Sequence, residues 1–155
     1  MARNNSAELN AIVMADISVA LEMTMNELLT KLQDYIQSDV YDVHSDSDRP
    51  WEINRTGEFK DSWERSNVVV SGSTATSQIF ENTSIMQQVM KGGHIVHEDA
   101  ETLAEIINSG NGYNFGQMEG ISRPYWDNFV NYVESNLNEI FMKYCKQQGV
   151  SITYN

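Results

Sequence analysis

The sequence predicts an α+β fold in which long N-terminal and C-terminal amphipathic helices pack on a small antiparallel sheet containing a β-hairpin. Apolar residues recur at three- and four-residue steps over residues 8–38 and again over 122–150, as on one face of a helix. Between them, two short β-rich runs flank the turn dipeptide Gly72-Ser73. A chain of 155 residues can bury a core without disulfides or metal. We therefore expect one domain over residues 1–155, with a loose N-terminus at 1–7 and an acidic loop at 39–50.

The C-terminal stretch predicts a long amphipathic helix. Ser122 offers a side-chain oxygen to cap its first turn, Pro124 suits that turn, and Gly149 suits the left-handed residue that ends a helix. Its inner face is predicted to hold Trp126, Phe129, Val130, Val133, Leu137, Ile140, Phe141 and Tyr144.

The N-terminal stretch has a second apolar stripe with a helical period. Its predicted inner residues are Leu9, Ile12, Val13, Ile17, Ala20, Leu21, Leu28, Leu32, Tyr35 and Ile36, broadened by Met14, Met23 and Met25. The loop that follows is rich in Asp and Ser, but no register supplies both the Gly and the Glu that a helix–loop–helix calcium site needs. We interpret it as a solvated loop, with weak cation binding as the alternative.

The middle of the chain predicts short elements. Thr56 can cap a short helix that carries Phe59 and Trp63 on its inner face. A β-hairpin follows, with strands at 68–70 and 75–81. A helix is expected over 99–109 with Gly110 at its end, and an edge strand over 151–154.

Composition limits the classes of function. The net charge of −12 argues against a surface that grips nucleic-acid phosphates, although an acidic wall can let DNA slide past without binding. Cys145 is the only cysteine, so no intramolecular disulfide or cysteine zinc cluster is possible. No apolar run is long enough to span a bilayer, and no export leader is evident, so we expect a chain made in a cytoplasm.

The sequence carries no catalytic signature. Nucleophile elbows, metalloprotease motifs, phosphate-binding loops and kinase motifs are all missing, so we predict that the protein is not an enzyme. His94 and His97, with Glu98 and Asp99, form the one cluster that resembles a metal site. Flanking glycines favour a turn there, and we predict no metal, no cofactor and no catalytic residue.

Two short motifs, in their order along the chain, resemble a known family. Arg55-Thr56-Gly57-x-Phe59-x-x-Ser62 follows the first helix and runs into Trp63, and Arg123-Pro124-Tyr125-Trp126 opens the last helix. A valine-rich hairpin and a glycine-rich aromatic loop at 110–116 lie between them. This order over residues 9–148 is similar to the tail-completion, or neck, proteins of tailed bacteriophages, the lambdoid gpZ-like group.

The resemblance implies a non-catalytic virion protein, assembled in the host cytoplasm as a homo-oligomeric ring at the head–tail junction, with a hexamer favoured over a dodecamer. Its partners would be the portal or connector and the tail tube or tail terminator. DNA would pass through the lumen without sequence-specific binding, and no membrane is involved. Residues carried over as structural or interface positions are Arg55, Thr56, Gly57, Phe59, Ser62, Trp63, Arg123, Pro124, Tyr125 and Trp126.

Two alternatives remain open from the sequence. One is another connector, adaptor or tail-terminator ring protein of the same virion. The other, from a different class, is a small acidic regulator that binds a basic host protein through the loop at 39–48.

Overall fold

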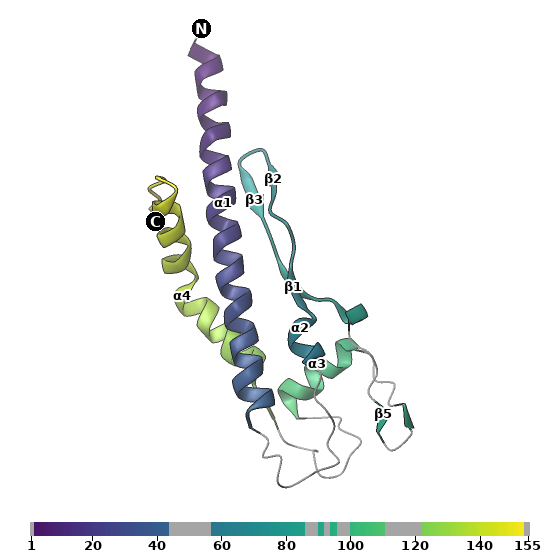
Figure 1. Ribbon diagram of the computed structural model, residues 1–155. Helices are drawn as coiled ribbons and strands as arrows, with labels where there is room; N and C mark the ends of the chain where they lie inside the picture. The colour runs from purple at the N-terminus through teal and green to yellow at the C-terminus, as the bar shows by residue number, and fades with distance from the viewer. Residues whose placement is uncertain are drawn as a thin grey trace. The chain divides into compact units, whose positions relative to one another are not determined.

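The computed structural model describes residues 2–43, 57–85, 90–91, 94–95, 100–110 and 122–153. It confirms the predicted α+β class, with a long helix at each end of the chain and short antiparallel strands between them (Figure 1). The helices are α1 (Ala2–Ile36), α2 (Glu58–Asp61), α3 (Ala100–Ser109) and α4 (Tyr125–Gln147). The strands are β1 (Trp63–Arg65), β2 (Val69–Ser71), β3 (Thr74–Thr76), β4 (Ile79–Glu81), β5 (Met90–Lys91) and β6 (His94–Ile95).

The described strands form three two-stranded sheets, paired β1 with β4, β2 with β3, and β5 with β6. The predicted hairpin is confirmed, with Val69 opposite Thr76 and Ser71 opposite Thr74 across the Gly72-Ser73 turn. Gly72 has φ 60°, the left-handed value that a two-residue hairpin turn needs at its first central position. The first strand lies one residue later than the predicted 68–70, and the predicted strand at 75–81 is divided into β3 and β4.

The chain forms two compact units, each built from segments that are distant in the sequence. The first unit comprises Met1–Leu29, Arg65–Phe80 and Tyr132–Asn155, and the second comprises Thr30–Glu64 and Glu81–Asn131. Helices α1 and α4 contribute residues to both units. The expectation of one domain over residues 1–155 stays a prediction.

The apolar stripe of α1 begins later than predicted. Leu9 and Ile12 are 63% and 61% exposed, so their assignment to the inner face was wrong. In the first unit, the N-terminal turns of α1 extend beyond the β2–β3 hairpin and the end of α4, so no neighbouring element of that unit covers them (Figure 1). The buried residues of α1 start at Met14 and continue through Ala20, Thr24, Met25, Leu28, Leu32 and Ile36.

Helix α1 runs into a π-helical turn at Gln37–Tyr41, where the predicted acidic loop was expected to begin. The amide of Asp42 donates to the Gln37 carbonyl at 2.9 Å, and the Gln37 side-chain amide donates back to the Asp42 carboxylate at 2.8 Å. The helical segment therefore continues through Asp39 to Tyr41, into the start of the predicted loop. Residues 44–50 of the loop lie outside the described residues.

The end of α4 follows the sequence prediction closely. Gly149 has φ 77°, its amide donates to the Lys146 carbonyl at 3.1 Å, and the Val150 amide donates to the Cys145 carbonyl at 2.9 Å. This pair of bonds is the Schellman arrangement, which satisfies carbonyls that the helix leaves without partners. Along the inner face, Phe129 and Ile140 are buried, but Leu137 is exposed against prediction. Residues 151–153 form no strand, and Tyr154 lies outside the described residues.

Candidate functional site

The residues of the two motif segments lie in the second unit. The structure describes Gly57, Phe59, Ser62 and Trp63 from the first segment, whereas Arg55 and Thr56 lie outside the described residues. From the second segment it describes Arg123, Pro124, Tyr125 and Trp126. The structure therefore describes eight of the ten predicted positions.

In the first segment, a short helix ends where a strand begins. Gly57 precedes α2 with φ 82°, a conformation that favours glycine. The buried Ser62 hydroxyl donates to the Phe59 carbonyl at 2.8 Å, and the Ser62 carbonyl accepts the Asn82 amide at 2.6 Å. Ser62 thus ends the helix with its side chain and starts the β pairing with its backbone. Trp63 is the first residue of β1 rather than part of the helix, which corrects the prediction.

The second segment is held to the end of α3. The Arg123 amide donates to the Ile107 carbonyl at 3.0 Å, and the Pro124 carbonyl accepts the first helical bond of α4 from the Asn128 amide at 2.9 Å. Arg123 itself is buried. The predicted capping role of Ser122 was wrong, because its hydroxyl donates instead to the Asn108 carbonyl at 2.7 Å.

Asn108 is the cap of α4 that the sequence reasoning missed. Its side-chain oxygen accepts the Trp126 amide at 3.1 Å, and its side-chain nitrogen donates to the Asp127 carboxylate at 3.2 Å. Helix starts leave amides without intrahelical partners, and Asn is a preferred residue for satisfying them. Asn108 is 18 residues away in the chain, so no local capping pattern could have revealed it.

Four aromatic residues of the two segments meet in one cluster. Tyr125, 1% exposed, makes edge contacts with Phe59 at 5.4 Å and Trp63 at 6.3 Å between ring centroids. Trp63 stacks on Trp126 at 5.2 Å with an interplanar angle of 24°, and Trp126 contacts Phe129 at 5.6 Å. We call Phe59, Trp63, Tyr125, Trp126 and Phe129 the aromatic cluster.

The aromatic cluster offers packing rather than acid–base chemistry. Edge-to-face and offset aromatic pairs are worth about 0.5–1.5 kcal/mol each beyond the burial of their area. The Tyr125 hydroxyl donates to the Ala104 carbonyl at 3.4 Å. The buried indole N–H of Trp63 has no hydrogen-bond partner among the described residues. The cluster can therefore fix α2, β1 and the start of α4 in the second unit as one body.

The shifted titratable groups lie elsewhere, in the first unit. Lys143 and the Tyr144 hydroxyl both donate to Oε2 of Glu27, at 2.5 and 2.6 Å. These bonds lower the pKa of Glu27, with Lys143 the larger cause, and raise the pKa values of Lys143 and Tyr144. Burial raises the pKa of the Cys145 thiol. A carboxylate with a lowered pKa is a weak general base. We therefore interpret the triad of Glu27, Lys143 and Tyr144 as a structural link between α1 and α4 in the first unit.

The described parts of the chain hold neither a metal-binding cluster nor a membrane-spanning helix. Among those residues, no group of three or more His, Cys, Asp and Glu side chains is arranged to hold a metal ion. His97 lies outside the described residues, as does the side chain of His94, so the absence of a metal at this cluster stays a prediction. None of the described helices is long and apolar enough to cross a membrane.

Comparison with known proteins identifies a family but supplies no characterised relative. No curated protein and no solved structure is detectably similar to this chain. A family model described as YomN matches residues 5–148, which is nearly the whole chain and includes both motif segments. The chain therefore belongs to the YomN family, a phage-derived family of the Bacillus prophage type.

Proposed function

We propose that this protein is a structural component of a tailed-phage particle that forms a ring at the head–tail junction. In this role, copies of the chain join the portal or connector to the tail tube or tail terminator. DNA passes through the ring without sequence-specific binding. The family is phage-derived, and the proposal adds a specific position in the phage particle.

The observation that supports this role most directly is the meeting of the two motif segments. Phe59 and Trp63 come from the first segment, Tyr125 and Trp126 from the second, and all four lie in the aromatic cluster. A shared structural core would require such contacts between motifs that are distant in the sequence. The resemblance to the neck proteins thus concerns residues that act together in one unit.

The distribution of charge supports the DNA-passage part of the proposal. The second unit holds 16 of the 22 acidic residues but 6 of the 10 basic residues, giving it −10 of the net charge of −12. A strongly acidic wall repels the phosphates of DNA and lets the polymer slide. We therefore expect the second unit to face the DNA path.

Electron microscopy of induced prophage particles tests the role. In particles with the intact gene we expect ring-shaped density for this chain on the DNA axis at the neck, and the density fixes the copy number. With the gene deleted we expect DNA-filled heads separated from tails, because the joint is missing. Supplying the gene from a plasmid restores joined particles. Normal joined particles that lack the protein would contradict the proposal.

A charge-reversal pair tests which unit faces the DNA. The double variant Asp46→Lys and Asp48→Lys changes the second unit by the same charge as Glu134→Lys and Glu139→Lys changes the first. We expect slower genome delivery, measured as potassium efflux or DNA release from purified particles, only for the Asp46 and Asp48 variant. Equal delivery by both double variants would exclude an acidic lumen formed by the second unit.

A further inference from the structure

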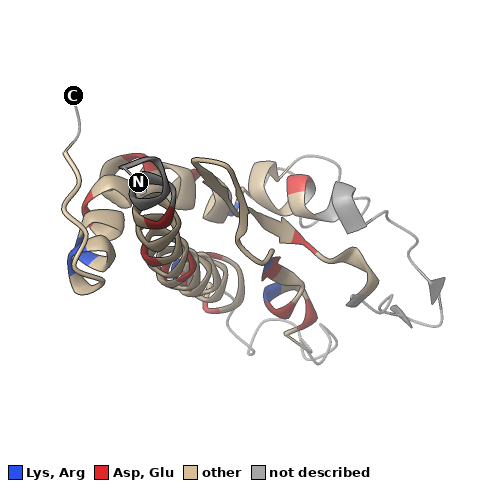
Figure 2. Ribbon diagram, turned by 90° about the horizontal axis from the view of Figure 1, so that it is seen from above, with Lys and Arg blue, Asp and Glu red and all other residues tan. Residues whose placement is uncertain are grey.

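The β2–β3 hairpin is an uncharged arm in a chain whose net charge is −12. Residues 66–80 contain no Asp, Glu, Lys, Arg or Pro. In Figure 2 the hairpin beside α1 accordingly shows neither acidic nor basic positions. Among the described residues its sheet has two strands, so within that part of the chain β2 and β3 each keep one outer edge. Val69 and Val70, whose side chains point to opposite faces, are 62% and 44% exposed. Ala75, on the same face as Val70, is half-buried, so that face is partly covered and the other is open.

The register determines which backbone groups point outward. Ser71 and Thr74 flank the two-residue turn and form the closing hydrogen-bonded pair, and Val69 opposite Thr76 is the next such pair. Val70 and Ala75, opposite each other between them, form the non-hydrogen-bonded pair. Their N–H and C=O groups therefore point away from the hairpin, Val70 along the edge of β2 and Ala75 along the edge of β3.

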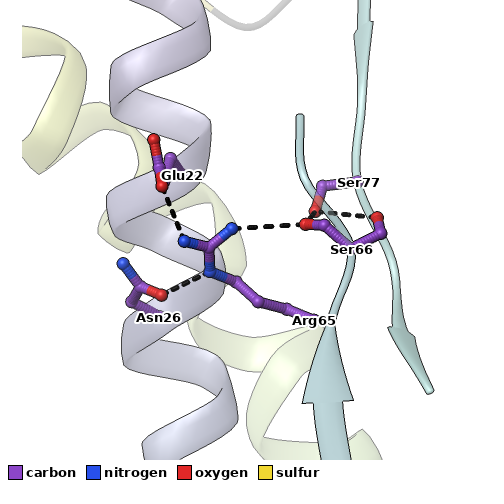
Figure 3. A network of polar contacts seen from close by, with 5 residues as sticks. All are labelled: Glu22, Asn26, Arg65, Ser66 and Ser77. Atoms are coloured by element: carbon purple, nitrogen blue, oxygen red, sulfur yellow. Dashed lines mark hydrogen bonds and ion pairs between the residues drawn. The ribbon is translucent and has the colours of Figure 1, made fainter. Parts of the chain in front are cut away.

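The base of the hairpin is fixed to α1 within the first unit (Figure 3). The Arg65 guanidinium pairs with Glu22 at 2.6 Å and donates to the Asn26 side chain. It also donates to the Ser66 carbonyl at 3.2 Å, and the Ser77 hydroxyl donates to the same carbonyl at 2.9 Å. The arm is thus anchored at its base, and its two edges keep a defined orientation with respect to α1.

Open edges with this composition are suited to pairing. Proteins that keep their edge strands unpaired usually protect them with charged residues, especially Lys, or with Pro, and this hairpin has neither. Charge also indicates the partner. Two copies that each carry −12 repel through most of their surfaces, so an uncharged arm in the unit that carries only −2 is the favoured place for them to meet.

We propose that copies of this chain associate by edge pairing of their hairpins, with the outer edge of β2 in one copy bound to the outer edge of β3 in the next. The two edges are different surfaces, so the contact runs head to tail and closes into a ring when the rotation between copies permits. Adjacent strands in such a sheet are antiparallel. This inference rests on the proposed ring, for which it identifies the contact between subunits.

Two proline variants test the pairing in purified full-length protein. Val70→Pro removes the outward N–H of β2 and Ala75→Pro that of β3, and neither donor is used inside the hairpin. Val70→Thr and Ala75→Ser keep the N–H groups and serve as matched controls. Far-UV circular dichroism and thermal unfolding establish that each variant is folded.

Sedimentation velocity over a concentration series gives the readout. We expect the wild type and both controls to form oligomers and each proline variant to associate about tenfold or more weakly, because each lost edge removes main-chain hydrogen bonds. An equimolar mixture of the two proline variants should form dimers, because Val70→Pro keeps its β3 edge and Ala75→Pro keeps its β2 edge. Larger rings should not form from the mixture.

Several outcomes would overturn the inference: a wild type that stays monomeric throughout, proline variants that associate as the wild type does, or a mixture that does not pair. None of these outcomes bears on the electron microscopy of particles. A neck ring without edge pairing would contradict the hairpin contact alone, whereas edge pairing in a protein missing from the neck would contradict the proposed position alone.

Discussion

The side chain of Asn108 connects the end of α3 to the start of α4. This side chain accepts a hydrogen bond from the Trp126 amide and donates one to the Asp127 carboxylate. The backbone carbonyl of Asn108 accepts a third from the Ser122 hydroxyl. These three bonds orient the first turn of α4, which carries Tyr125 and Trp126 into the aromatic cluster. One amide side chain thus sets the entry angle of the helix that the second motif opens.

Replacing Asn108 with Ala should lower the free energy of unfolding by about 1–2 kcal/mol, as the loss of a helix cap does. The change removes the hydrogen-bond acceptor of the Trp126 amide, which is partly buried and has no intrahelical acceptor. Urea denaturation followed by tryptophan fluorescence measures the effect. Asn138→Ala, at an exposed position in the middle of α4, is the control and should leave stability unchanged or slightly raised. Equal losses in both variants would argue against capping by Asn108.

Glu27 should make stability depend on pH in the acid range. Its folded pKa lies below the ordinary 4.5, so its contribution is present above pH 4.5 and is lost as pH falls through the folded value. Because the Glu27 and Lys143 side chains are 31% and 47% exposed, we expect Glu27→Gln to cost only about 0.5–1 kcal/mol at pH 7. The difference from wild type should shrink in urea titrations below pH 4.5.

The exposed Glu134→Gln is the control for this acid dependence and should follow the wild type at every pH. At the alkaline end the responsible groups are Lys143 and Tyr144, whose folded pKa values are raised above 10.5 and 10.0. Their contribution is present below these ordinary values and is lost as pH rises through the raised ones. A Glu27→Gln difference that is constant from pH 3 to pH 11 would contradict the role of the triad.

At the scale of elements, Arg65 joins β1 to α1 within the first unit. Arg65→Met keeps much of the aliphatic stem and removes the bonds to Glu22, Asn26 and the Ser66 carbonyl. Since the Glu22 side chain is half-exposed and water can replace its partner, we expect a cost of about 1 kcal/mol. The Ser66 amide, which donates to the Gln78 carbonyl at 2.9 Å, should lose protection in hydrogen exchange.

Lys143→Met is the matched control for this change, because it removes another ion pair of the first unit without touching the hairpin. We expect Ser66 exchange to be unchanged in that variant. If the Ser66 amide exchanges equally in wild type and Arg65→Met, the hairpin is held by its own strands rather than by α1.

The elements whose signals are local were predictable from the sequence. Gly149, Gly110 and Gly72 mark the end of α4, the end of α3 and the hairpin turn, and each has the positive φ that such positions require. Trp63 was placed in a helix because its i, i+4 spacing from Phe59 fits one. Trp63 is instead the first residue of a strand, and its side chain is buried there as well. Periodicity over so short a run cannot separate the two.

The features that depend on distant residues were not predictable. The exposure of Leu9 and Ile12 depends on how far the neighbouring elements of the first unit reach along α1. The cap by Asn108 depends on how α3 and α4 meet. The aromatic cluster was predictable in composition, because the motif residues were named, but not in its geometry, since one sequence carries no information on which rings touch.

At the scale of the whole molecule, charge is distributed unevenly between the units. The second unit carries −10 and the first −2, and the one long uncharged arm belongs to the first. We therefore expect contacts between copies and repulsion of DNA to involve different parts of the chain. Self-association would use the nearly neutral unit, and the acidic unit would remain available to repel the phosphates of a passing genome.

This separation predicts an unusual response to salt. Copies that carry −12 each repel over a range that is about 10 Å at 0.1 M salt and about 3 Å at 1 M, whereas main-chain hydrogen bonds are not screened. Self-association measured by sedimentation velocity should therefore strengthen as sodium chloride is raised across that range. Association through ion pairs would weaken over the same range. Val70→Pro controls for non-specific salting-out, because it should associate about tenfold or more weakly than the wild type at every salt concentration. A wild type that dissociates on addition of salt would show that charged surfaces hold the copies together.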